Sequence, residues 1–203
     1  MSVMKLTNGG FRYPANDRWV FRSLSLNIEA GEAVRVTGRN GSGKSTLLKV
    51  LSGRLKLSEG FLEPHAAYEA AYMDQFAGDM LSNDLTIAEQ FKAADMGNVA
   101  HGIAPTAMLA EFGIGLQNRL DAFIGHLSGG ERQIVALLCT LAAGAKVLCL
   151  DEFTSALDVR SGQIADTLLN HANTAACIAL VLVSHSGVGI RGARELNMSQ
   201  YEE

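Results

Sequence analysis

The sequence predicts an α/β fold in one domain, residues 1–203, and three observations support this expectation. Residues 147–150 and 178–183 are short, continuously apolar and separated by a segment long enough for a helix. This arrangement is typical of a parallel sheet that helices cover on both faces. A Gly-rich loop near residue 40 follows a predicted strand and precedes a predicted helix. With 48% hydrophobic residues, the chain can also bury one sizeable core.

The N-terminal third is expected to be mainly β-strand, because apolar residues alternate or cluster there in short runs bounded by Gly and Asn. The strands predicted in this part of the chain are residues 3–7, 19–28 and 33–37, and a later strand is predicted at residues 68–73. A turn is expected at residues 29–32, and the pattern becomes helical over residues 44–51.

Residues 76–126 differ from the rest of the chain. Helical patterns at 86–94 and 105–112 are joined by Gly-rich segments, and no clear strand pattern occurs. We therefore expect a small helical lobe at 76–126, inserted into a core formed by residues 1–75 and 127–203.

Composition and charge exclude several classes of protein. A total of 17 Lys+Arg against 21 Asp+Glu gives a net charge of -4, which provides no broad positive surface for nucleic acid. The first residues lack the apolar segment of a signal peptide, and the most apolar stretch is too short to span a bilayer. Cys139, Cys149 and Cys177 lie in apolar segments without metal-ligand spacing, so we expect buried thiols in a cytoplasmic protein.

The Gly-rich loop at residues 38–46 matches the pattern G-x-x-x-x-G-K-[ST] of a P-loop. In such a loop, backbone N–H groups and the helix N-terminus bind phosphate. Lys44 would reach the outer phosphates of ATP, and the Ser45 hydroxyl would bind Mg²⁺. An accidental Gly-rich turn would give this pattern in about one chain in a hundred of this size. The residues expected to bind ATP here are Gly38, Arg39, Asn40, Gly41, Ser42, Gly43, Lys44, Ser45 and Thr46.

Two carboxylates, Asp151 and Glu152, end the apolar strand at 147–150. The carboxyl end of a strand is where α/β folds place ligand chemistry. Asp151 is expected to hold Mg²⁺, directly or through water, and Glu152 to orient and polarise the attacking water. Alone, the pair could be a solvated acidic turn, but the upstream P-loop favours an NTPase site.

The segment at residues 127–133, Leu-Ser-Gly-Gly-Glu-Arg-Gln, resembles the signature sequence of ABC ATPases. It is also a capping box, with Ser128 at the N-cap and Glu131 three residues later, before a helix that Gly144 ends. The two interpretations are compatible, because the signature of this family opens a helix.

The resemblance extends over nearly the whole chain and implies a fold and an assembly. The implied fold is a P-loop NTPase (RecA-like) core with an N-terminal antiparallel β subdomain and an inserted small helical lobe. Two subunits would pair head to tail, so that the signature of one acts on ATP bound to the other. The residues implied to act in trans are Ser128, Gly129, Gly130 and Glu131.

Four further positions match family motifs in the expected order. Tyr13 looks like the aromatic residue that stacks on adenine, although a Tyr before Pro can also be simple packing. Gln75 occupies the position of the Q-loop residue that senses Mg²⁺ and water, which implies catalytic and metal-binding roles. Asp158 resembles the D-loop residue at the dimer interface, and His185 resembles the switch histidine that contacts the γ-phosphate.

Two segments resemble one subfamily, and two other features depart from the usual pattern of the family. Residues 112–121 and 151–158 look most like ATPases of binding-protein-dependent importers. Phe153 stands where the family usually has Pro, which would change the stiffness of the loop and leave the Glu152 carboxylate in place. The stretch at residues 61–74 is shorter than usual in the family, so the antiparallel sheet should be small.

The resemblance implies an ATP-hydrolysing transporter subunit that uses ATP and Mg²⁺, with Glu152 as the catalytic carboxylate. Its implied partners are a second copy or a related ATPase subunit, a separate membrane-spanning permease and, in an importer, a solute-binding protein, with no nucleic acid. The permease would hold it at the inner face of the cell membrane. The alternative is a soluble ABC-type ATPase acting on the ribosome or DNA. A regulator that no longer hydrolyses ATP would be expected to lack Glu152 or His185.

Overall fold

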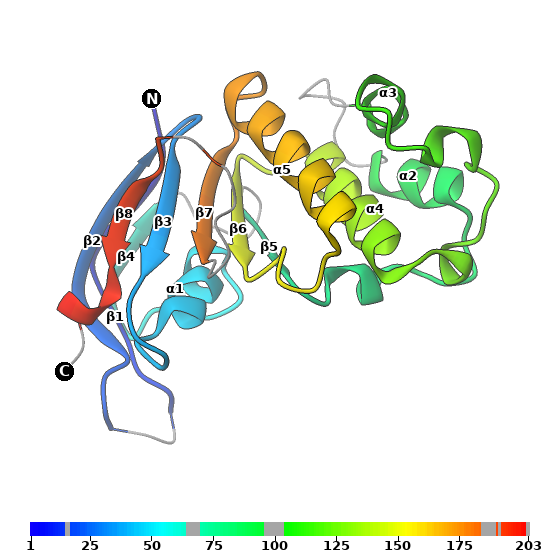
Figure 1. Ribbon diagram of the computed structural model, residues 1–203. Helices are drawn as coiled ribbons and strands as arrows, with labels where there is room; N and C mark the ends of the chain where they lie inside the picture. The colour runs from blue at the N-terminus through cyan, green and yellow to red at the C-terminus, as the bar shows by residue number, and fades with distance from the viewer. Residues whose placement is uncertain (15–16, 64–69, 96–103, 184–189, 191, 202–203) are drawn as a thin grey trace.

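The strands of the molecule form two separate sheets (Figure 1). The computed structural model describes residues 1–14, 17–63, 70–95, 104–183, 190 and 192–201. The antiparallel sheet has the order β2-β1-β4, formed by β1 (Ser2–Phe11), β2 (Phe21–Glu29) and β4 (Glu59–Glu63). The parallel sheet has the order β5-β6-β7-β3-β8, formed by β3 (Ala33–Thr37), β5 (Ala70–Asp74), β6 (Val147–Asp151), β7 (Ala179–Val183) and β8 (Arg194–Asn197).

The parallel sheet lies between two apolar cores, because successive side chains of a strand point to opposite faces. On β7, Val181 belongs to the core that includes the antiparallel sheet and helix α1, whereas Leu180 and Leu182 belong to the core beneath helices α4 and α5. Figure 1 shows α4 and α5 together on one side of the sheet. The three helices are α1 (Lys44–Leu51), α4 (Gly129–Ala142) and α5 (Val159–Thr174). Both faces of the sheet are therefore covered, as its continuously apolar strands predicted.

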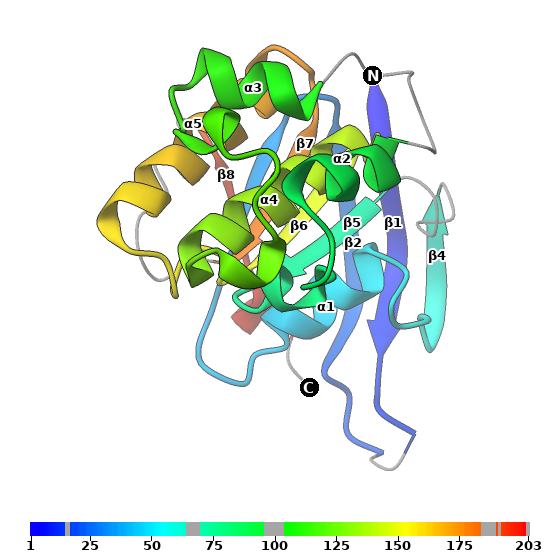
Figure 2. The same cartoon turned by 90° about the vertical axis from the view of Figure 1, so that its right-hand side faces the viewer.

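The described chain between β5 and α4 consists of short helices joined by turns and loops, and one isolated bridge joins Thr86 to Phe123. Its elements are η2 (Ala77–Met80), α2 (Ile87–Asp95), α3 (Pro105–Glu111), η4 (Leu116–Asn118) and η5 (Ile124–His126). Figure 2 shows α2, α3 and α4 in front of the parallel strands. The helices predicted at 86–94 and 105–112 are therefore confirmed. None of the described helices is both long and apolar enough to cross a membrane.

Two strands and one thiol differ from the sequence-based expectation. Strands β4 and β8 were not predicted, because both lie at sheet edges and lack an apolar run. In β8 only Leu196 is buried. The expectation that all three thiols are buried is wrong for Cys177, which is exposed, with φ 54°, in the connection between α5 and β7. Cys139 and Cys149 are buried, and burial raises the pKa of Cys149 to about 12.

Candidate nucleotide site

The loop between β3 and α1 has the backbone of a phosphate-binding turn. Gly43 is the N-cap of α1 and has a left-handed φ of 84°. A Cβ atom at Gly43 would lie 2.6 Å from Val20 Cγ1, so both the backbone angle and the available space require glycine. At Gly38, with φ 139°, a Cβ would lie 2.6 Å from Ser42 Oγ. The backbone of the loop therefore packs too closely against neighbouring side chains to admit a Cβ atom at Gly38 or Gly43.

Three features of this loop, at Lys44, at Ser42 and at the start of α1, suit a bound phosphate. Lys44 is only 8% exposed, and its Nζ donates to the carbonyl oxygens of Gly38 at 2.9 Å and Arg39 at 2.8 Å. The buried Ser42 hydroxyl has no hydrogen-bond partner among the described residues. No side chain caps the N-terminus of α1, and its first turn contains no acidic residue. A buried cation, an unpartnered hydroxyl and an uncapped helix end fit a bound polyphosphate.

Ser45 and Asp151 meet at the end of the loop. The Ser45 hydroxyl donates to Asp151 Oδ1 at 3.0 Å. The second carboxylate oxygen, Oδ2, accepts a hydrogen bond of 2.7 Å from the hydroxyl of Tyr72 on β5. Among the described residues, no three His, Cys, Asp or Glu side chains cluster as a metal site. A hydroxyl and one carboxylate fit Mg²⁺, which normally takes its remaining ligands from phosphate and water.

Tyr72 is a component of this site that the sequence did not indicate. Burial, and then the hydrogen bond to Asp151, raise the pKa of Tyr72, so its hydroxyl stays protonated and donates. The Arg54 guanidinium lies 4.5 Å from the centre of the Tyr72 ring. Tyr72 pairs with Cys149 in the β5–β6 ladder. Cys149 lies two residues before Asp151 on β6, so the side chains of Tyr72 and Asp151 are on the same face of the sheet. Only the register of these strands brings the two side chains together.

Glu152 has a strained backbone at the end of β6. Its φ is 51°, a left-handed conformation that costs a non-glycine residue roughly 1–2 kcal/mol. The Glu152 N–H donates to the carbonyl of Val183 at 2.9 Å, and the Glu152 carbonyl accepts from the N–H of Ser155 at 2.9 Å. These bonds hold the conformation from both sides, at a position where strain is common in active sites.

Gln75 lies beside the segment that follows Glu152. Its Oε1 accepts a hydrogen bond of 3.0 Å from the hydroxyl of Ser155. Among the described residues, no hydrogen bond joins Gln75 to Ser45 or Asp151. Its predicted role as a metal ligand therefore stays a prediction, and His185 lies outside the described residues.

Tyr13 lies against the P-loop helix. Its hydroxyl is 3.2 Å from Thr46 Oγ1, and its ring meets the ring of Phe11 edge-on with centroids 4.9 Å apart. The side chain is nevertheless 43% exposed. The exposed ring therefore lies close to the loop that would hold the phosphates, a position suited to contact with a base.

The N-terminus of α4 is a complete capping box, as the sequence predicted. Ser128 Oγ accepts from the Glu131 N–H at 3.2 Å, and Glu131 Oε2 accepts from the Ser128 N–H at 2.9 Å. Arg119 also pairs with Glu131 Oε1 at 2.7 Å. Burial alone would raise the pKa of Glu131, but the bonds from Ser128 and the charge of Arg119 lower it overall. The carboxylate is therefore ionised at neutral pH.

The start of α4 opens onto a hollow of about 400 Å³ between α4, α5 and η4. Asp158 caps α5 there, accepting from the Ser161 N–H at 2.9 Å and hydroxyl at 3.0 Å. The residues lining the hollow are Ile114, Gly115, Leu116, Arg119, Ser128, Glu131, Ile134, Asp158, Arg160, Ser161 and Ile164. No residue of the P-loop lines it. Ser128 and Glu131 of the signature therefore line a hollow that no residue of the P-loop reaches.

The comparisons with known proteins agree with this arrangement. A family model described as ABC transporter matches residues 21–155. The cytochrome c biogenesis ATP-binding export protein CcmA of Rhizobium johnstonii is 32% identical over 192 residues, which are 90% of this chain and 88% of that protein. A "probable metal transport system ATP-binding protein" of Treponema pallidum is 31% identical over 182 residues, 89% of this chain and 75% of that protein.

A solved structure with the same fold is a dimeric ATP-binding cassette in a post-hydrolysis state, bound to ADP and Pi. It has a TM-score of 0.75 at 24% identity and covers 96% of this chain and 94% of its own. This likeness confirms the predicted P-loop NTPase fold class. Together, the family match, the curated relatives and the phosphate-binding loop show that the chain belongs to the ABC transporter family, as an ATP-binding subunit with ATPase activity.

Proposed function

We propose that this subunit hydrolyses ATP within a head-to-tail dimer and drives a separate membrane-spanning subunit. The observation that carries the proposal is the separation of the two ATP-contacting segments. Among the described residues, the P-loop has one buried hydroxyl without a partner, that of Ser42, and no P-loop residue lines the hollow onto which Ser128 and Asp158 open. A second subunit, in the simplest case another copy, would supply the signature that each P-loop lacks.

The roles of the residues follow from their chemistry. Lys44 and the backbone of the P-loop would bind the phosphates, and the exposed ring of Tyr13 would stack on adenine. Ser45 and Asp151 would hold Mg²⁺, which when bound offsets the negative charge of the outer phosphates. Glu152, fixed by its two backbone hydrogen bonds, would orient the attacking water and take its proton.

Other predicted residues have supporting roles in this proposal. Gln75 and His185 would complete the site around the attacking water and the γ-phosphate. From the second subunit, the N–H groups of the signature turn would face that phosphate, because the N–H groups and the positive end of the dipole at a helix N-terminus attract anions. The signature residues in question are Ser128, Gly129, Gly130 and Glu131, and Asp158 would lie at the same dimer interface. The dimeric cassette bound to ADP and Pi supports an assembly of this kind.

The helical segment supplies a candidate surface for the membrane subunit. Phe76, Met80 and Phe123 are 60%, 74% and 46% exposed, so large apolar side chains of this segment are accessible to another protein. We propose that residues 76–126 form a lobe that contacts the membrane subunit, and that residues 1–75 and 127–203 form the core. That contact would hold the protein at the inner face of the membrane.

The relatives named above differ in their transport roles. One relative named above is an export protein and the other a metal transport protein, so similarity to importer ATPases and a solute-binding partner stay predictions. Neither relative's name refers to the ribosome or DNA, and the net charge of -4 gives no support to that alternative.

The Glu152→Gln variant tests the catalytic part of the proposal. Because the amide cannot take a proton from water, we expect kcat to fall roughly 10²–10⁴-fold while the Kd for ATP stays the same. Glu195→Gln, an exposed change on β8, is the matched control and should keep full activity. Unchanged turnover in Glu152→Gln would exclude Glu152 as the catalytic carboxylate.

The partner is tested by purifying the same variant with ATP from detergent-solubilised native membranes. Mass spectrometry should identify a stoichiometric protein with several membrane spans. Recovery of ribosomal or DNA-associated proteins without a membrane protein would contradict the proposed transport role.

A further inference from the structure

Gln133, on the second turn of α4, is a buried amide with hydrogen bonds at both ends. It is 3% exposed. Its Oε1 accepts from the Gly78 N–H at 2.8 Å, and its Nε2 donates to the carbonyl of Asp74 at 2.7 Å and to that of Phe153 at 3.4 Å. A glutamine has one acceptor and two donor hydrogens at this end, so the three bonds use its full donor capacity.

The partners of Gln133 flank the two segments that carry proposed catalytic groups. Asp74 immediately precedes Gln75, and Phe153 immediately follows Glu152. One side chain therefore connects the ends of β5 and β6 to the helix that opens with the signature. Because the amide is buried, no water can replace these bonds without the structure opening.

Close packing strengthens the connection on the side of Gly78. A Cβ atom at Gly78 would lie 3.0 Å from the backbone nitrogen of Gln133 and 3.1 Å from the carbonyl carbon of Arg132. The η2 turn therefore rests directly on the backbone of α4. A shift of α4 along its axis would move η2, and with it the chain that leads back to Gln75.

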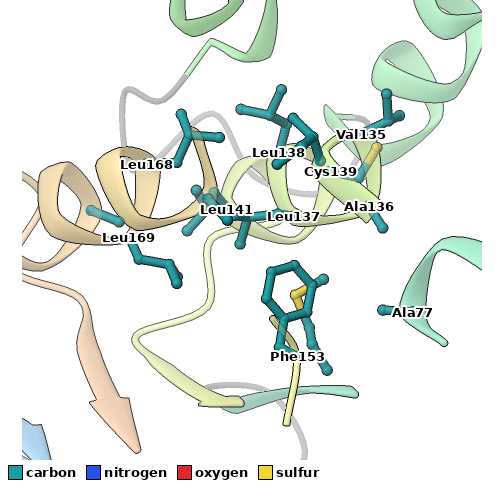
Figure 3. Close-up of a cluster of buried hydrophobic side chains, with 14 of the residues drawn as sticks. Ala77, Val135, Ala136, Leu137, Leu138, Cys139, Leu141, Phe153, Leu168 and Leu169 are labelled. Atoms are coloured by element: carbon teal, nitrogen blue, oxygen red, sulfur yellow. The ribbon is translucent and has the colours of Figure 1, made fainter. Parts of the chain in front are cut away.

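Phe153 provides the corresponding contact on the side of Glu152. Its ring is 2% exposed and lies beneath α4, next to Ala136 and Leu137, with Ala77 nearby (Figure 3). The expectation that Phe153 mainly alters the stiffness of the loop is therefore incomplete, since the ring anchors the loop in the core. The segment after Glu152 is held to α4 by this packing and by the hydrogen bond from Gln133.

We infer that Gln133 is a positioning residue that fixes Gln75 and Glu152 relative to the signature helix. This inference rests on the proposed function. In each subunit, the helix that would contact the partner's ATP also holds the residues that would act on the subunit's own ATP. Gln133 thus couples the two sites of a dimer through one buried amide.

The variants that test this inference are Gln133→Leu and Gln133→Glu. Leucine has a similar size and removes all three hydrogen bonds, whereas glutamate keeps an acceptor for the Gly78 N–H and loses both donors in its ionised form. Thr140→Val is the matched control on the same helix, because the Thr140 hydroxyl bonds only to the Ala136 carbonyl of its own helix. Circular dichroism and thermal unfolding of the full chain establish which variants are folded.

We expect kcat to fall at least about tenfold in both Gln133 variants, with the Kd for ATP within about twofold of wild type, because the P-loop is untouched. Thr140→Val should retain wild-type kcat. A residue that only stabilises the fold would lower the melting temperature and leave kcat unchanged well below it. If Gln133→Leu does not fold, Gln133→Glu decides the question.

A double-mutant cycle with Gln75→Ala distinguishes an effect of Gln133 on the position of Gln75 from a general loss of structure. If Gln133 acts partly through Gln75, its loss should reduce kcat less in the Gln75→Ala background than in wild type. Full additivity, or wild-type kcat in a folded Gln133 variant, would overturn the inference. A wild-type chain without ATPase activity would instead contradict the proposed function itself.

Discussion

Two helices of this subunit begin at segments proposed to contact ATP, and they differ in whether side chains cap their N-termini. Helix α1 begins at Gly43 with no side-chain cap and no acidic residue in its first turn. Helix α4 begins at Ser128 with a full capping box, and Glu131 lies in its first turn. The first four N–H groups of any α-helix have no partner within the helix. Side chains cap the start of α4, whereas no side chain caps the start of α1.

This difference in capping indicates which helix N-terminus depends on a ligand for its hydrogen bonds. At α1, the Ser42 hydroxyl has no partner in the part of the chain that the structure describes, and Lys44 donates to carbonyl oxygens of its own loop. At α4, the side chains of Ser128 and Glu131 accept from each other's backbone N–H groups, so these two groups are satisfied within the chain. We therefore expect strong ATP affinity to come from α1, whereas α4 should affect turnover after a second subunit has docked.

The largest expected effect is the loss of nucleotide binding in Lys44→Ala. Removing a buried ammonium from the phosphate loop should raise the Kd for ATP by at least about 100-fold, consistent with the loss of two charge-assisted contacts. Isothermal titration calorimetry measures this effect, and Lys56→Ala, an exposed change, is the control. Near-wild-type affinity in Lys44→Ala would show that α1 is not the main source of binding.

Ser128→Arg should have the opposite profile. The Kd for ATP should stay within about twofold of wild type, while kcat should fall at least about 100-fold, because a bulky cation would block the turn that faces the partner's phosphate. Thr167→Arg adds the same side chain to an exposed position on α5 and serves as the control. Normal turnover in Ser128→Arg would rule out a role of the signature in hydrolysis.

A smaller effect is expected from Tyr72→Phe, which deletes the hydroxyl that donates to Asp151 Oδ2. The Mg²⁺ concentration for half-maximal ATPase activity should rise about 3–10-fold, because one neutral-to-charged hydrogen bond is lost. The affinity for Mn²⁺ in the presence of ATP, measured by electron paramagnetic resonance, should fall in parallel. Tyr201→Phe is the control, and an unchanged metal affinity in Tyr72→Phe would mean that Asp151 is positioned without Tyr72.

The smallest expected effect concerns the stability of the α4 N-terminus. The folded pKa of Glu131 is lowered from 4.5, so its contribution is fully present above that pH and is lost as the pH falls through the lower folded value. Glu131→Gln should lower the free energy of unfolding by up to about 1 kcal/mol at pH 7. In urea unfolding curves this difference should narrow below pH 4.5, and a difference independent of pH would exclude a charge effect.

The distance along the chain between interacting residues explains which parts of the site were predictable from sequence. The P-loop and the capping box at Ser128 are local, because the residues that interact lie within a few positions of each other. Tyr72 and Gln133 act across 79 and 20 to 59 residues, on partners set by strand register and helix packing. Strand β8 was missed for a related reason, since an edge strand needs no apolar run.

The central claim is that the signature of one subunit serves the P-loop of the other, and mixed dimers test it most directly. Lys44→Ala and Ser128→Arg chains, each inactive alone, would be co-expressed with different tags and purified together. In a mixed dimer, one site combines an intact P-loop with an intact signature. The account predicts recovery of up to about half of wild-type ATPase activity per dimer, because one of two sites is restored. Mixed dimers as inactive as the two parents would contradict it.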